Sequence, residues 1–352
     1  MRRRSSDADR ASFYLLQVLR GYAACLVVLY HLTLHARQYM PHSFLGDAFN
    51  FGNFGVDIFF IVSGFIIFFS TASNFGRPSE VAGYLARRFS RIFPPYWLVL
   101  LGCILLELRF ADADLSIARV LFSAVLVYGY QEPIVAVSWS LSYELIFYIA
   151  VACLLWARRN IALALLVVWA CIATANHAIG LPARMWLSWW VVEFVLGCMI
   201  GWAASRGFLT CLAGSARPLF HACLGAITAL GAWSATEVQK MDGASQAVLL
   251  AFAAIAIAAA GSVERTAGNQ ASKLARLLGD ASYGIYLAHY PLLQLAYPLA
   301  RRQPVSDLVA PDVFNLLLFV LLIAAGVAFH LVLEKPLVSW TSAALTRRRR
   351  DG

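Results

Sequence analysis

The chain has 352 residues, of which 61% are hydrophobic and 13% are charged. A soluble domain carries roughly 25% charged residues, so this composition over this length excludes one large soluble core and indicates many membrane-spanning helices. The net charge is +9, but the Lys and Arg residues stand at loops and ends between apolar segments, so we expect no nucleic-acid partner.

The N-terminal segment MRRRSSDADR is basic, and no small-residue cleavage site follows a short apolar core. We therefore expect the first apolar run to be retained as a membrane helix. The seven cysteines lie mostly inside apolar segments and form no CxxC pair, so neither a structural disulfide nor a cysteine metal site is expected.

Apolar segments long enough to cross a bilayer, which takes about 20 residues, recur along the whole chain. The predicted fold is all-α: a polytopic transmembrane helical bundle that forms a single domain over 1–352. We expect ten spans, at 14–34, 53–73, 92–109, 138–157, 161–177, 187–204, 218–234, 245–261, 278–299 and 312–333. The shorter run 117–130 is either an eleventh span or a re-entrant or interfacial helix.

The distribution of basic residues predicts the orientation of the bundle. With the N-terminus placed inside, most of the 28 Lys and Arg residues fall in cytoplasmic segments. This bias predicts both termini in the cytoplasm, with the bundle over about 14–340 and basic tails at 1–13 and 341–352. We expect a multi-pass protein of the inner or plasma membrane, in contact with membrane lipids.

The first span contains LRGYAACLVVLYH (19–31), in which Arg20 and His31 are eleven residues apart. At about 100° per residue the two side chains share one helix face, roughly 16 Å apart. Ionisable residues in a membrane helix are costly and are usually functional or paired, although a lone His can simply bond a neighbouring helix. A metal site of His31 and His35 would lack a third ligand, so we expect no metal.

The run RRFSRIFPPYW (87–97) places Arg88 and Arg91 on one helix face. Two guanidinium groups can clamp phosphate with bidentate hydrogen bonds, whereas the alternative is positive charge that only marks the cytoplasmic side. Pro94 and Pro95 suit the first turn of a helix, so we expect them to end one helix and begin the next.

In SWSLSYELIFY (138–148), Ser140, Glu144 and Tyr148 share a helix face. We expect Glu144 at the depth of His31, where a carboxylate would fix the imidazole tautomer and raise its basicity. The alternative is a Glu144 satisfied by Ser or Tyr hydroxyls for helix packing. The same two interpretations apply to Asp57 in FGVDIFFIVSGF, where Ser63-Gly64 indicates close helix contact.

Together these motifs resemble the integral-membrane acyltransferase family 3. The matching stretches follow the family's order over nearly the whole chain: LRGYAACLVVLYH, FGVDIFFIVSGFII, RRFSRIFPPYW, SWSLSYELIFY, LGDASYGIYLAHYPL (278–292) and LEKP (333–336). The resemblance implies an acyltransferase for groups other than aminoacyl groups. It implies transfer of an acyl group, often acetyl, from cytoplasmic acyl-coenzyme A to a hydroxyl of a surface or lipid-linked glycan, with acetyl-coenzyme A as co-substrate and no bound cofactor.

By this resemblance His31 matches the family's essential histidine, and Arg20 matches its arginine partner. Arg88 and Arg91 match its RxxR pair, which handles the acyl donor, and Glu334 matches a carboxylate near the C-terminal end. The expected catalytic residues are His31, Glu144 and Asp57. The expected substrate- and donor-binding residues are Arg20, Arg88, Arg91, Ser282, Tyr283, His289 and Glu334.

Alternatives remain open in the sequence. His31 could act as a general base on the acceptor hydroxyl or accept the acyl group itself. The acceptor could be a lipid or a small molecule instead of a glycan. A proton-coupled transporter or flippase would use His31 and Glu144 as relay groups; inverted repeats would favour this class, and none is visible.

Overall fold

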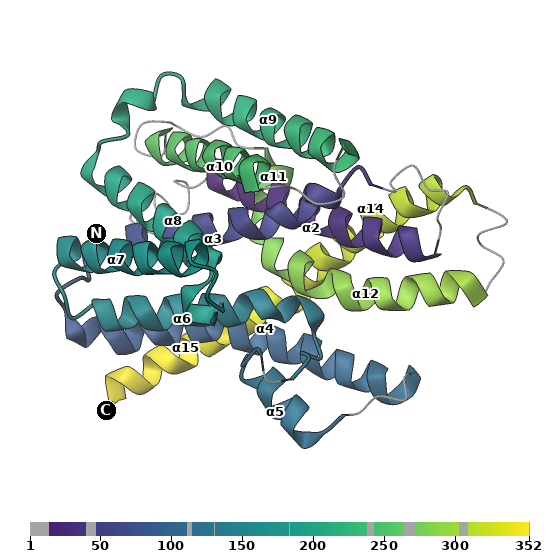
Figure 1. Cartoon of the computed structure of the whole chain (residues 1–352). Helices are drawn as coiled ribbons and strands as arrows, with labels where there is room; N and C mark the ends of the chain where they lie inside the picture. Colours follow the sequence, from purple (N-terminus) through teal and green to yellow (C-terminus); the bar gives the residue numbers. More distant parts are fainter. Residues whose placement is uncertain are drawn as a thin grey trace. The chain divides into compact units, whose positions relative to one another are not determined.

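The computed structural model describes residues 14–39, 47–110, 115–129, 131–182, 184–237, 243–263, 272–302 and 309–351. All regular structure in these ranges is helical, which confirms the predicted all-α fold (Figure 1).

The α-helices, in chain order, are α2 (Tyr14–Tyr39), α3 (Phe54–Ser70), α4 (Val81–Phe110), α5 (Ile117–Ala124), α6 (Trp139–Leu154), α7 (Arg159–Ala178), α8 (Trp189–Arg206), α9 (Ala216–Glu237), α10 (Gly243–Val263), α11 (Lys273–Asp280), α12 (Ser282–Arg302), α14 (Pro311–Phe329) and α15 (Lys335–Asp351). A π-helical turn, His330–Glu334, joins α14 to α15. Short 3-10 turns lie at Asn50–Asn53, Pro78–Glu80, Ala136–Ser138, Met185–Leu187 and Thr210–Leu212.

Each of the ten predicted spans coincides with a helix. Within the described residues, seven helical segments are both long enough and apolar enough to cross a membrane. Helices α8, α9 and α12 coincide with predicted spans but do not belong to this set. The chain is therefore a multi-pass membrane protein. The number of spans and the side of the membrane on which the termini lie stay predictions.

The run 117–130 is not an eleventh span, because its helix α5 has 8 residues. Two contacts fold α5 back along α4. The guanidinium of Arg119 donates to both carboxylate oxygens of Glu107, at 2.8 and 3.1 Å. The Tyr96 hydroxyl donates to the Ser123 carbonyl at 2.7 Å. This antiparallel arrangement fits the re-entrant or interfacial alternative.

The expected helix break at Pro94 and Pro95 is wrong, because both prolines lie inside α4. Proline has no N–H, so two helical carbonyls lose their donors in this turn. Membrane helices tolerate this loss where neighbouring side chains supply other hydrogen bonds. The carbonyls that lose their donors are those of Ser90 and Arg91, four residues before each proline. The Tyr283 hydroxyl of α12 donates to the next carbonyl, that of Ile92, at 2.9 Å.

Two compact units divide the chain. The first comprises 1–73 and 159–282, with α2, α3 and α7 to α11; the second comprises 74–158 and 283–352, with α4 to α6, α12, α14 and α15. The predicted single domain stays a prediction. The predicted tail 1–13 lies outside the described residues, while most of 341–352 belongs to α15.

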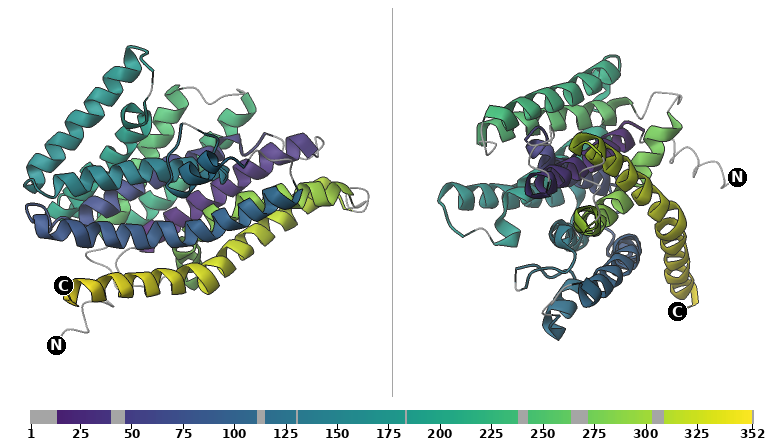
Figure 2. Two further views of the ribbon diagram at one scale, coloured as in Figure 1. Left: turned by 90° about the horizontal axis from the view of Figure 1, so that it is seen from below. Right: turned by 90° about the vertical axis from the view of Figure 1, so that its right-hand side faces the viewer.

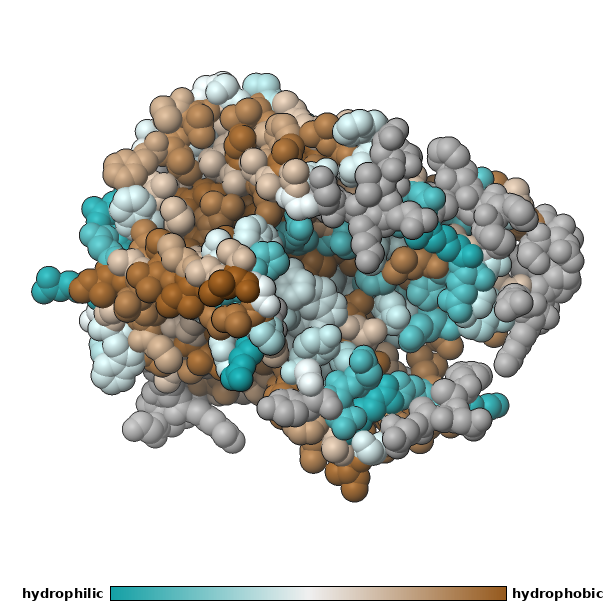
Figure 3. Space-filling model, viewed as in Figure 1, coloured by the Kyte–Doolittle hydropathy of each residue, from teal (hydrophilic) through white to brown (hydrophobic). Residues whose placement is uncertain are grey.

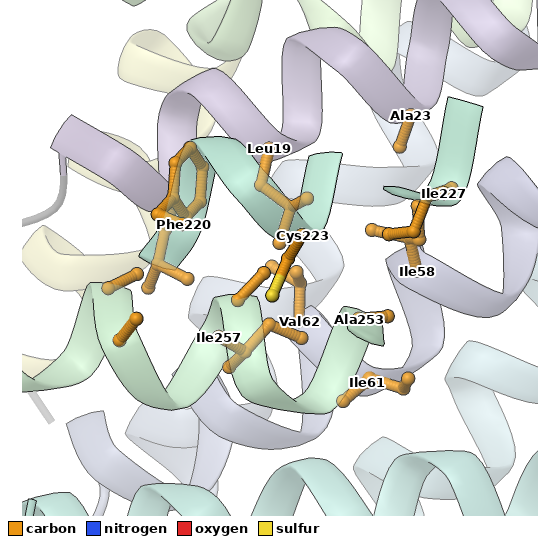
Figure 4. Packing of buried hydrophobic residues seen from close by; sticks show 14 of the residues in the cluster. Leu19, Ala23, Ile58, Ile61, Val62, Phe220, Cys223, Ile227, Ala253 and Ile257 are labelled. Atoms are coloured by element: carbon orange, nitrogen blue, oxygen red, sulfur yellow. The ribbon is translucent and has the colours of Figure 1, made fainter. Parts of the chain in front are cut away.

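The core of the first unit lies among α2, α3, α9 and α10. Figure 4 shows side chains from these four helices in contact, among them Leu19, Val62, Phe220 and Ile257. All four are buried at 2% exposure or less, so their close van der Waals packing holds the helices together.

Glycines set the contact between α3 and α8. A Cβ on Gly64 would lie 2.0 Å from the Phe194 carbonyl oxygen, and one on Gly197 would lie 1.9 Å from the Ile61 carbonyl oxygen. Only glycine lets two helix backbones approach this closely. The close helix contact predicted from Gly64 is therefore confirmed.

In the second unit, α15 runs beside α4, as the left-hand view of Figure 2 shows. The Ser90 and Ser342 hydroxyls lie 2.9 Å apart across this contact. Figure 3 shows broad areas of apolar side chains on one face of the molecule. Large exposed apolar side chains, including Leu105 and Leu321, are what a lipid-facing surface requires.

Candidate active site

His31 and Arg20 lie on the continuous helix α2 of the first unit, and both residues are half-buried. The Nδ1 atom of His31 lies 3.0 Å from the Val27 carbonyl oxygen. A carbonyl can only accept, so Nδ1 carries the proton and, in the neutral imidazole, Nε2 carries the lone pair. This tautomer is the one that a general base acting through Nε2 requires. Arg20 donates to Gln17 Oε1 at 3.0 Å.

His35 follows His31 by one turn and donates from Nδ1 to the His31 carbonyl at 2.8 Å. Both histidines thus use Nδ1 for backbone hydrogen bonds. In the described part of the chain, no three His, Cys, Asp or Glu residues are grouped as metal ligands would be.

Asp57 lies in the first turn of α3 and is 6% exposed. Gln246 of α10 donates to its Oδ1 at 3.2 Å, and the buried Glu193 of α8 lies close enough to interact with it electrostatically. Sequence reasoning did not assign Glu193 or Gln246 to a site. The only signal was an ionisable Glu193 in an apolar segment, and periodicity does not pair residues on separate helices.

Arg88 of α4 contacts two neighbouring aromatic rings in the second unit. Its guanidinium carbon is 5.4 Å from the centre of the Tyr84 ring and 5.2 Å from that of Tyr148. Both distances suit cation–π contacts, which favour a planar guanidinium over an ammonium group. The two rings therefore fix the orientation of Arg88.

Arg91, one turn further along α4, interacts electrostatically with four groups from three other segments. These are Glu144 and Tyr148 of α6, Tyr283 of α12 and Glu334 of the π-helical turn. We call Arg88, Arg91, Glu144, Tyr148, Tyr283 and Glu334 the arginine cluster. It contains two guanidinium groups and two carboxyl groups, so the predicted RxxR pair lies beside compensating negative charge.

Glu144 is satisfied by Tyr148, whose hydroxyl donates to its carboxylate. This contact agrees with the packing alternative for Glu144. Ser140, on the same predicted face, instead pairs with the Tyr286 hydroxyl at 2.6 Å. The predicted partner of Glu144, His31, belongs to the first unit, so their pairing stays a prediction.

Glu334 is 7% exposed, and its Oε2 lies 2.9 Å from Nδ1 of His330. Sequence reasoning assigned Glu334 to the donor site through the family motif but did not assign His330. The i, i+4 spacing of the two residues was the available signal.

Two other predicted site residues do not belong to the arginine cluster. Ser282 belongs to the first unit and is fully buried, and its hydroxyl has no hydrogen-bond partner among the described residues. His289 is fully buried on α12, where Nδ1 donates to the Ile285 carbonyl at 3.1 Å. Their assignment to substrate binding stays a prediction.

Ionisable residues buried among long apolar helices define the chain as an integral-membrane protein with a polar interior, the arrangement of a membrane enzyme or transporter. The chain belongs to the acyltransferase family 3: the family's profile, described as an acyltransferase domain, matches residues 13–335. This confirms the predicted family. The protein is a membrane acyltransferase that transfers groups other than aminoacyl groups.

Two curated relatives match nearly the whole chain. The exopolysaccharide production protein ExoZ of Rhizobium meliloti (strain 1021) is 31% identical over 308 residues, which cover 83% of this chain and 92% of ExoZ. The acyltransferase MdmB of Streptomyces mycarofaciens is 25% identical over 373 residues, which cover 90% of this chain and 89% of MdmB. No solved structure shows a significant match.

Proposed function

We propose that this protein transfers an acyl group, in the simplest case acetyl, from cytoplasmic acyl-coenzyme A to a hydroxyl of a surface or lipid-linked glycan at the inner or plasma membrane. The observation that carries the proposal is the arginine cluster, a partly buried site with two guanidinium groups in a member of this acyltransferase family. The name of ExoZ, an exopolysaccharide production protein, supports a glycan acceptor.

The two arginines of the arginine cluster have different roles in binding the acyl donor. Coenzyme A carries several phosphate charges, and guanidinium groups bind phosphate with strong bidentate bonds. Arg91 interacts electrostatically with Glu144 and Glu334, whereas Arg88 contacts two aromatic rings that orient its guanidinium. We assign Arg88 to the donor phosphate and Arg91 to the alignment of the site.

His31 is the proposed catalytic residue at the acceptor. In one route, Nε2 takes the proton of the acceptor hydroxyl while its oxygen attacks the thioester carbonyl; the carbon–sulfur bond breaks and coenzyme A leaves as the thiolate, which takes up a proton. In the other route, Nε2 attacks the thioester first, and the acyl-histidine then passes the acyl group to the hydroxyl. Both routes yield one ester and one free thiol.

The remaining predicted residues have supporting roles in this proposal. Arg20 lies on the same helix face as His31, on the predicted cytoplasmic side, where it would meet the donor. The buried Asp57 and the half-buried Glu144 carry carboxyl groups that would stabilise positive charge developing during the reaction.

The proposal is tested with purified protein in liposomes, acetyl-labelled acetyl-coenzyme A and a polysaccharide acceptor. We expect alkali-labile label on the polysaccharide with wild-type protein and none with His31→Ala at equal folded amount. Label on lipid instead of polysaccharide would contradict the glycan acceptor. No label on any acceptor, with donor left intact, would contradict acyl-coenzyme A as the donor.

A further inference from the structure

A π-helical turn interrupts the helical run that begins at Pro311 and ends at Asp351. Such turns are rare and occur frequently at functional sites. The three residues inside this turn, Leu331, Val332 and Leu333, are 47%, 69% and 44% exposed. The only polar residues of this turn are the two at its ends, His330 and Glu334.

These two end residues, His330 and Glu334, point away from the exposed surface, with side chains that are 12% and 9% exposed. Nδ1 of His330 lies 2.9 Å from Oε2 of Glu334, and the imidazole N–H donates to the carboxylate. Glu334 is one of the groups that act on Arg91, whereas His330 is not. His330 therefore contacts Glu334 directly, and Glu334 acts on Arg91 electrostatically.

Close packing restricts where the Glu334 carboxylate can lie. Its Oε2 is 3.0 Å from the position that a Cβ on Gly284 would occupy. Next to it, α12 and α14 approach so closely that a Cβ on Gly326 would lie 2.5 Å from the Ile285 Cα. A carboxylate in such a space has few other positions, so its hydrogen bond to His330 selects its orientation.

We infer that His330 is a positioning residue of the donor site: it orients the Glu334 carboxylate, whose charge acts on Arg91, the arginine that aligns the site for the acyl donor. This inference rests on the proposed acyl-coenzyme A donor. The competing explanation is that His330 only fills space, in which case a Phe of similar shape would serve equally well.

Three substitutions separate these explanations in donor kinetics. His330→Phe keeps the volume and removes the N–H; His330→Asn places an amide N–H near the position of Nδ1, and His330→Gln places one near Nε2. We expect His330→Phe to raise the KM for acetyl-coenzyme A about tenfold with little change in kcat, the size of one lost hydrogen bond to a charged group. We expect His330→Asn, but not His330→Gln, to restore most of the affinity.

The matched control is His221→Phe, an exposed histidine of α9, which should leave the KM unchanged. A wild-type KM in His330→Phe, or equal recovery by Asn and Gln, would overturn the inference.

A second measurement does not depend on the identity of the substrate. We expect His330→Phe to lower the thermal unfolding midpoint by a smaller amount in an Arg91→Ala background than in wild type, because Glu334 couples the two sites. Equal shifts in both backgrounds would overturn the inference. If wild-type protein transfers no acyl group from acetyl-coenzyme A, the proposed donor fails, and this cycle still decides the role of His330.

Discussion

The guanidinium carbon of Arg88 lies 5.2 Å from the centre of the Tyr148 ring. The same tyrosine donates its hydroxyl to Glu144. One side chain of α6 therefore fixes both a guanidinium group on α4 and a carboxylate on its own helix. Loss of the ring and loss of the hydroxyl should consequently have different effects.

The planar shape of Arg88 should matter more than its charge. Arg88→Lys keeps the charge but loses the flat group that contacts two rings and can bind phosphate bidentately. We expect the KM for acetyl-coenzyme A to rise about tenfold, with a smaller change in kcat, measured by initial rates in proteoliposomes. The control is Arg87→Lys, at an exposed position on the same helix, which should behave as wild type. Equal effects at both positions would contradict the assignment of Arg88.

The Tyr148 hydroxyl should contribute to stability through Glu144. Tyr148→Phe keeps the ring beside Arg88 and leaves Glu144 without this donor, so we expect a loss of about 2 kcal/mol in the free energy of unfolding. The KM for the donor should change little, because the ring contact remains. Tyr148→Leu removes both contacts and should raise this KM as well. Identical KM values for the Phe and Leu variants would show that the ring does not orient Arg88.

The glycine contact between α3 and α8 should tolerate no side chain. Gly64→Ala places a methyl group 2.0 Å from the Phe194 carbonyl oxygen, so the helices must separate. We expect a loss of about 3 kcal/mol in the free energy of unfolding, seen as a lower unfolding midpoint in detergent. Gly102→Ala on α4 is the control, because no atom lies within 4 Å of its added Cβ. If both variants unfold at the same temperature, the α3–α8 contact is looser than described.

The sequence predicts the helices well and their partners poorly. Ten apolar runs of spanning length coincide with helices because burial in lipid demands continuous apolar helix. The helix break predicted at Pro94 and Pro95 is wrong, because the rule for proline considers only the local sequence and not the packing of neighbouring helices. The Tyr283 hydroxyl supplies a hydrogen bond in that turn from a helix almost 200 residues further along the chain.

The residues of the candidate site were likewise predicted from the sequence, whereas their contacts across helices were not. The i, i+3 spacing brought Arg88 and Arg91 together, and the family motif singled out Glu334. Neither revealed that carboxyl groups from two other segments interact electrostatically with Arg91, because helix packing and not periodicity brings those segments together. His330 was missed for the same reason: its contact matters only because Glu334 lies beside Arg91.

The central claim is an acyl transfer to a glycan that needs His31. The most direct measurement compares surface glycans by NMR, before and after mild alkali, from cells with wild-type protein, with none, and with His31→Ala at equal expression. The account predicts an alkali-labile acyl signal in wild type that is absent from the other two. The same signal in all three, or in none, would contradict it.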